Sequence, residues 1–77
     1  MTDALITPDI LFWARNRALL SQETLAHKAQ VKVDDIALWE KGEQRPSFRQ
    51  AQKLAKKLRI PFGYLFIEGE EFESKFS

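Results

Sequence analysis

The chain has no cysteine, only three glycines and three prolines in 77 residues, and a net charge of only +1. Without cysteine there is no disulfide framework and no thiolate metal site. No apolar run approaches the ~20 residues that a membrane-spanning helix needs. The start, MTDALITPD, carries acids instead of the basic region that opens a secretion signal. We therefore expect a cytoplasmic protein with no membrane partner.

Length and composition allow one globular domain. Apolar residues make up 44% of the chain and charged residues 30%, which is typical of a soluble domain and not of a disordered one. Charge is unevenly distributed, since residues 1–66 hold eleven Lys and Arg against seven Asp and Glu. Residues 67–77 hold one lysine against four glutamates. We expect a domain over 1–67 and an acidic tail or linker over 68–77.

The sequence offers no arrangement of residues that would support catalysis. His27 is the only histidine, and there is no Ser/His/Asp set and no glycine-rich phosphate loop. The glutamates at 68, 70, 71 and 73 could be interpreted as a metal cluster, but a solvated tail explains them better. We therefore expect no enzyme, no cofactor and no metal.

Local start and stop signals predict five short helices and no strand. Thr7-Pro8, Ser21 and Ser47 are suited to begin helices, and Gly42 and Pro61 are suited to end them. The predicted helices cover about 8–17, 22–29, 33–41, 48–59 and 62–66. Their inward faces hold residues at helical spacing, namely Ile10, Leu11, Ala14, Leu25, Ala26, Ala29, Ile36, Trp39, Phe48, Ala51, Leu54, Ala55, Leu58, Leu65 and Phe66. The fold class is all-α, a compact five-helix bundle.

The second and third predicted helices are joined by a tight turn over 29–31. This is the outline of a helix-turn-helix, a motif that often places its second helix in the DNA major groove. The gapless pattern Ala14-Arg15, Leu20-Ser21-Gln22-x-x-Leu25-Ala26, Val31, Ile36, Trp39-Glu40-x-Gly42, Pro46, Leu54-Ala55 and Leu65-Phe66 resembles the lambda-repressor-like, Xre-type helix-turn-helix family. The resemblance covers about residues 8–67.

The segments ITPDILFWAR, ALWEKGEQRPSFRQAQKLAKKL and IPFGYLF also resemble the domain that precedes ImmA/IrrE-type metallopeptidases. Such fusions are associated with mobile elements, stress regulation and toxin–antitoxin loci. The chain contains no His-Glu-x-x-His helix, so the peptidase itself is not present in these 77 residues.

The family resemblance implies a regulator that binds double-stranded DNA through the helix at 33–41. Its contacts would come from Gln22, Lys32, Val33, Asp34, Ala37, Leu38, Lys41 and Arg45. The resemblance also implies a structural ion pair between Arg15 and Glu40. The alternative function is a protein-interaction or regulatory module of the same fold, serving a metallopeptidase or toxin partner.

The sequence departs from the family pattern in three places, and the third is the reading face of the helix at 33–41, where Val33, Asp34, Ala37 and Leu38 stand in place of the usual Gln, Arg, Ser, Thr or Lys. Gln30 and Leu19 stand where glycine is frequent, and Gln30 is expected to need a positive φ. Asp34 and Asp35 open the helix that would read DNA, and they have three interpretations. They stabilise the helix start through its dipole, or Asp34 accepts a hydrogen bond from cytosine, or both recognise a basic protein partner.

Large apolar residues are abundant near the C-terminus, at Tyr64, Phe66, Ile67, Phe72 and Phe76. One interpretation is a homodimer contact through Tyr64, Phe66, Phe72 and Phe76, and another is a neighbouring domain. The remaining one is packing against the chain's own first helix.

Overall fold

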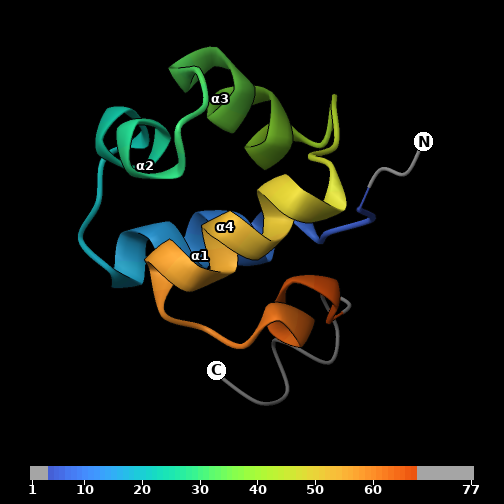
Figure 1. The fold of residues 1–77 in the computed structure, drawn as a ribbon. Coiled ribbons are helices and arrows are strands. Elements are labelled where there is room, and N and C mark those ends of the chain that lie inside the picture. The colour runs from blue at the N-terminus through green and yellow to red at the C-terminus, as the bar shows by residue number, and fades with distance from the viewer. Residues whose placement is uncertain (1–3, 68–77) are drawn as a thin grey trace.

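The computed structural model describes residues 4–67. Its elements are α1 (Pro8–Arg17), α2 (Gln22–Ala29), α3 (Val33–Lys41), α4 (Phe48–Leu58) and a 3₁₀ helix η1 (Phe62–Phe66). No strand element occurs within 4–67, so the all-α prediction is confirmed. Figure 1 shows α3 at the top of the molecule, α1 and α4 across its middle and η1 beneath them.

The count of five α-helices is wrong, because the fifth element is a 3₁₀ helix. Pro61 precedes it in an extended conformation and Ile67 leaves it extended again, with φ −69° and ψ 132°. Five residues between two extended ends can form i→i+3 hydrogen bonds but are too few for a stable α-helical ladder.

Side-chain caps set the starts of α2 and α4 as the sequence predicts. The Ser21 hydroxyl accepts from the Thr24 N–H at 3.0 Å. At α4 the Ser47 hydroxyl accepts from the Gln50 N–H at 3.1 Å, and the Gln50 side chain accepts from the Ser47 N–H at 2.8 Å. Two otherwise free N–H groups are satisfied by this reciprocal box.

Thr7 does not cap α1 with its side chain, contrary to expectation. Its hydroxyl donates to the Ile67 carbonyl at 2.6 Å, and its backbone N–H donates to the Leu65 carbonyl at 2.6 Å. Thr7 therefore ties the start of α1 to the end of η1, sixty residues later in the chain.

The core is a single apolar cluster drawn from every element. Ile10, Leu11, Leu25, Ile36, Leu54 and Leu65 are fully buried, and Trp39 is only 3% exposed. Phe48, which was expected in the core, is 43% exposed. Its ring instead packs on Phe62 and Phe66, with centroids 6.3 Å from each.

No helix between residues 4 and 67 is long and apolar enough to cross a membrane.

Candidate nucleic-acid interface

The turn between α2 and α3 is a left-handed cap on a residue that is not glycine. Gln30 has φ 62° and ψ 43°, as the sequence predicts, and the Val31 N–H donates back to the Ala26 carbonyl at 2.9 Å. Ala29 is buried beneath the turn. This tight connection fixes the angle at which α3 leaves α2, with only Val31 and Lys32 between Gln30 and the first residue of α3.

An ion pair joins α1 to α3. The Arg15 Nε donates to Glu40 Oε2 at 2.6 Å, and a second guanidinium nitrogen donates to Glu40 Oε1 at 3.2 Å. The two side chains are only 11% and 6% exposed, so the pair is largely desolvated. This is the ion pair that the family resemblance implies. A third guanidinium nitrogen donates to the Leu20 carbonyl at 2.9 Å, which holds the α1–α2 connection in the same network.

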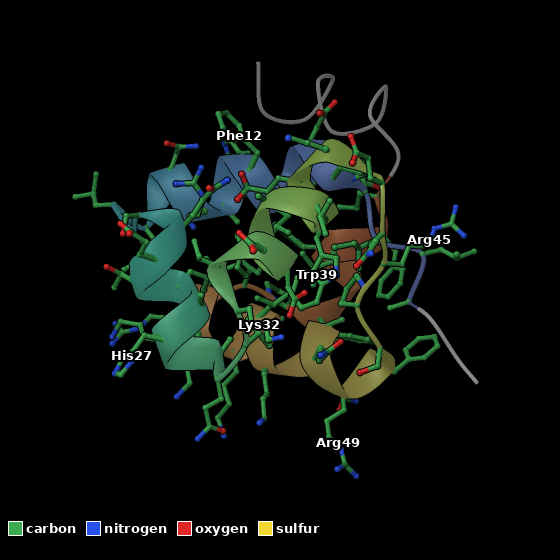
Figure 2. All side chains as sticks on the ribbon, turned by 90° about the horizontal axis from the view of Figure 1, so that it is seen from above. Phe12, His27, Lys32, Trp39, Arg45 and Arg49 are labelled. Carbon is green, nitrogen blue, oxygen red and sulfur yellow. The ribbon has the colours of Figure 1, made fainter. Side chains whose placement is uncertain are left out.

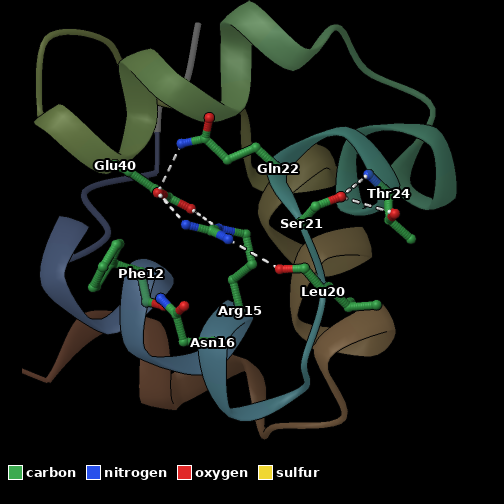
Figure 3. A network of polar contacts seen from close by, with 8 residues as sticks. All are labelled: Phe12, Arg15, Asn16, Leu20, Ser21, Gln22, Thr24 and Glu40. Carbon is green, nitrogen blue, oxygen red and sulfur yellow. Dashed lines mark hydrogen bonds and ion pairs between the residues drawn. The ribbon is translucent and has the colours of Figure 1, made fainter.

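Gln22 joins this network, which the sequence did not indicate. Its side-chain amide donates to Glu40 Oε1 at 3.0 Å, so the Glu40 carboxylate receives three hydrogen bonds from two other helices (Figure 3). The side chain is half-buried. In the sequence, the only indication of this hydrogen bond to Glu40 was a polar residue in the first turn of α2. A polar residue at that position fits a phosphate contact equally well.

The inner face of α3 is locked in place while its outer face is open. Ile36 is fully buried and Trp39 nearly so, whereas Asp34 and Lys41 on the other side are exposed. Of the remaining predicted contacts on this helix, Val33 is 39% exposed and the pair Ala37 and Leu38 is half-buried.

The cations predicted to flank α3 lie at its two ends. Lys32 is the N-cap residue of α3, and Arg45 lies in the loop that follows it; both are exposed. Figure 2 looks down on α3 and shows the Arg45 side chain projecting outward from this loop. Lys32 and Arg45 thus stand before and after α3, and Asp34 and Lys41 are exposed on the helix itself.

The two acids that open α3 have different surroundings. The Asp35 carboxylate accepts from the Lys32 N–H at 3.4 Å, and the residue is half-buried. It acts as a weak cap on the start of the helix. Asp34 is exposed on the outer face. The structure thus gives Asp35 a structural role and leaves Asp34 available to a partner.

The predicted dimer residues fall into two groups. Tyr64 and Phe66 are half-buried, and Phe66 packs on its own chain, with its ring 5.0 Å from that of Phe62 in an edge-on arrangement. Phe72, Phe76 and the glutamates of the acidic tail lie outside the described residues. Among residues 4–67 no three acidic, histidine or cysteine side chains gather as they would around a metal ion.

Comparison with protein families decides the class. A family model described as helix-turn-helix matches residues 11–65, which is most of the chain. The chain belongs to the helix-turn-helix family. The match includes the α1–α3 ion pair, the α2–α3 turn and the whole of α3.

Similar proteins include regulators. The chain is 36% identical over 56 residues to a protein described as an uncharacterized transcriptional regulator in the ATPase CF(0) region of Rhodospirillum rubrum. That match covers 73% of this chain and 52% of the relative, so the chain spans about half the length of the curated relative it matches.

Solved structures share the fold. The restriction-modification controller protein C.AhdI from Aeromonas hydrophila is 32% identical, with a TM-score of 0.73 over 77% of this chain and 89% of that one. A hypothetical transcription factor from Neisseria, at 15% identity, has a TM-score of 0.80 over 99% of this chain and 98% of its own, and shows likeness of fold alone.

Proposed function

We propose that this helix-turn-helix regulator binds double-stranded DNA by placing α3 in the major groove. The observation that carries the proposal is the separation of the two sides of α3. Its inner side is anchored by buried Ile36 and Trp39 and by the Glu40 network, and on its outer side Asp34 and Lys41 are exposed. A rigidly oriented helix with an exposed face is what groove recognition requires.

Contacts divide into backbone and base contacts. Lys32, Lys41 and Arg45 surround α3 and suit the phosphates, which supply affinity without sequence information. Val33, Asp34, Ala37 and Leu38 face the bases. Gln22 is proposed to lie beside a phosphate, although its amide already donates to Glu40. A dimer would read two half-sites about one helical turn of DNA apart, roughly 34 Å.

The test is a titration against mixed-sequence duplex DNA over a range of salt concentrations. Phosphate contacts appear as a loss of affinity with added salt, and each one contributes about one unit of slope on logarithmic axes. The Lys32→Ala/Arg45→Ala variant should bind more weakly to every duplex and show a slope smaller by about two units.

The matched control is Lys56→Ala/Lys57→Ala, which removes the same charge from exposed positions far along α4. Its slope should remain that of the unchanged chain. Equal losses in both variants would mean that the chain responds to net charge alone, and the proposed interface would then be wrong.

A second function is favoured by one observation, the exposed carboxylate of Asp34 at the start of α3. An acid at this place repels phosphates, but it suits a basic surface on a protein. We therefore keep the interaction module for a metallopeptidase or toxin as the alternative. Under this alternative, replacing both Asp34 and Asp35 by Asn should abolish binding of the protein partner and change DNA binding little, whereas a clear gain in DNA affinity would favour the DNA proposal.

A further inference from the structure

The C-terminal ends of α1 and α4 and the side of α2 enclose a cleft of about 810 Å³. Its lining consists of five cations and three apolar residues, Arg17, Ala18, Leu20, Lys28, Lys56, Lys57, Leu58 and Arg59, and it contains no acid. We call it the cationic cleft. No residue of α3 lines it. Figure 1 shows the ends of α1 and α4 at the lower left of the molecule and α3 at the top.

Within residues 4–67, three residues other than glycine have a positive φ, and two of them flank the cationic cleft. Leu19, between Ala18 and Leu20, has φ 60°, and Arg59, in the lining itself, also has φ 60°. Glycine would adopt this conformation without strain. Leu19 is 91% exposed, so its side chain gains nothing from packing within residues 4–67. Both positions end a helix: Arg59 is the left-handed C-cap of α4, and the Leu20 N–H after Leu19 donates back to the Arg15 carbonyl at 3.1 Å, so two helix-ending turns border the cationic cleft.

A smaller hollow of about 300 Å³ adjoins the cationic cleft and leads back to η1. Arg17 and Arg59 line both spaces, and the smaller one also includes Trp13, Ile60, Pro61 and Tyr64. The Arg17 guanidinium stacks 5.5 Å from the centroid of the Trp13 ring. The two hollows therefore share Arg17 and Arg59, and together they extend from η1, near the end of the described chain, to the ends of α1 and α4; we call the pair the groove.

We infer that the occupant of this groove is the chain's own segment 68–77, EGEEFESKFS. Four glutamates and one lysine complement the five cations, and two phenylalanines complement the apolar part of the lining at Ala18 and Leu20. DNA is the weaker candidate, because a sugar-phosphate backbone has no large apolar group to pack on the half-buried Ala18 and Leu20.

The segment is long enough to reach the cationic cleft. It begins after Ile67, which Thr7 holds at the start of α1, whereas the cationic cleft lies at the end of that helix. Ten helical residues span about 15 Å. Five extended residues span roughly 16 Å. A path alongside α1 therefore brings Phe72, with glutamates on both sides, to the cationic cleft.

The test uses the full chain and its lack of cysteine. A nitroxide attached at Ser74→Cys should selectively weaken the NMR amide signals of residues 17–20 and 56–60. Mixing spin-labelled chain with isotope-labelled chain that carries no nitroxide should produce no such loss, because the contact lies within one chain. Loss in the mixed sample, or a loss spread over the whole domain, would overturn the proposal.

Charge-reversed variants test where the segment docks. Lys56→Glu/Lys57→Glu should restore the weakened signals, because both lysines are exposed and line the cationic cleft. The control Lys41→Glu/Arg49→Glu makes the same charge change at exposed positions outside it and should leave the signals weakened. Docking in this cleft would be refuted if the amide signals stayed fully weakened in the Lys56→Glu/Lys57→Glu variant. It would also be refuted if the signals were restored in the control.

Discussion

Gln30 and Leu19 both carry a side chain in a conformation that favours glycine. A Cβ in the left-handed region costs roughly 1–2 kcal/mol. Leu19 buries almost nothing within the described chain, so Leu19→Gly should raise the free energy of unfolding by about 1 kcal/mol, with the greater freedom of unfolded glycine offsetting part of the gain. Urea denaturation measures this.

Leu19→Ala is the control for that experiment, because alanine keeps the Cβ and its strain. It should leave the unfolding free energy within about 0.5 kcal/mol of the unchanged chain, as exposed substitutions usually do. An equal gain from alanine and glycine would show that strain at position 19 is not the cause.

The Glu40 carboxylate is the most consequential polar group in the described part of the chain. Glu40→Gln keeps its shape but leaves the mostly buried Arg15 guanidinium without its counter-charge. Since removing one member of a buried pair is strongly destabilising, we expect a loss of about 3 kcal/mol in unfolding free energy. Glu43→Gln, at an exposed acid, should change it by less than about 0.5 kcal/mol.

Replacing Asp34 and Asp35 one at a time should have different effects on stability and on DNA binding. Asp35→Ala removes a weak cap and a first-turn acid and should cost about 0.5 kcal/mol of stability. Asp34→Asn should leave stability unchanged and strengthen non-specific DNA binding, because one repulsion from the phosphates is removed. Thermal unfolding of both variants checks the predicted change in stability, and a DNA titration of both checks the predicted change in affinity. If Asp34→Asn instead relaxed discrimination at one base pair by roughly 1–3 kcal/mol, Asp34 would be reading cytosine.

At the scale of elements, the helices were predictable because their boundaries are set locally. The capping residues Ser21, Ser47 and Gly42 act within one helical turn, so their roles can be predicted from the residues next to them in the sequence. Thr7 and Phe48 were mispredicted because their partners, Ile67 and Phe66, are far away in the chain. No local pattern contains such distant contacts.

The candidate site follows the same division. The location of α3 and its exposed residues could be predicted from helical periodicity and family resemblance. The third hydrogen bond of Glu40, from Gln22, could not, because it depends on the crossing of α2 and α3. The cationic cleft could not be predicted from the sequence either. Lys56, Lys57 and Arg59 have the pattern of ordinary cations at a helix end, and it is the fold that brings Arg17 and Lys28 close to them.

The start of α4 offers a test at this scale. Ser47→Ala removes the acceptor for the Gln50 N–H and should reduce the free energy of unfolding by about 1 kcal/mol. Ser47→Asp, which retains an acceptor at the helix start, should recover most of the loss. A Ser47→Ala chain as stable as the original would mean that α4 is held by its buried apolar face alone.

At the scale of the whole molecule, the domain has two surfaces of different character. One is the outer side of α3 with Lys32, Lys41 and Arg45 around it, and the other is the cationic cleft at the ends of α1 and α4. We propose that DNA binds the first surface and that the chain's own acidic segment occupies the second.

NMR mapping of the full chain with a mixed-sequence DNA duplex tests this assignment most directly. We predict that the largest amide shifts on adding duplex will fall in residues 32–38 and in the loop around Arg45. The amides of 17–20 and 56–60 should shift little. Shifts confined to the cationic cleft, with α3 unchanged, would contradict the proposal that α3 enters the major groove.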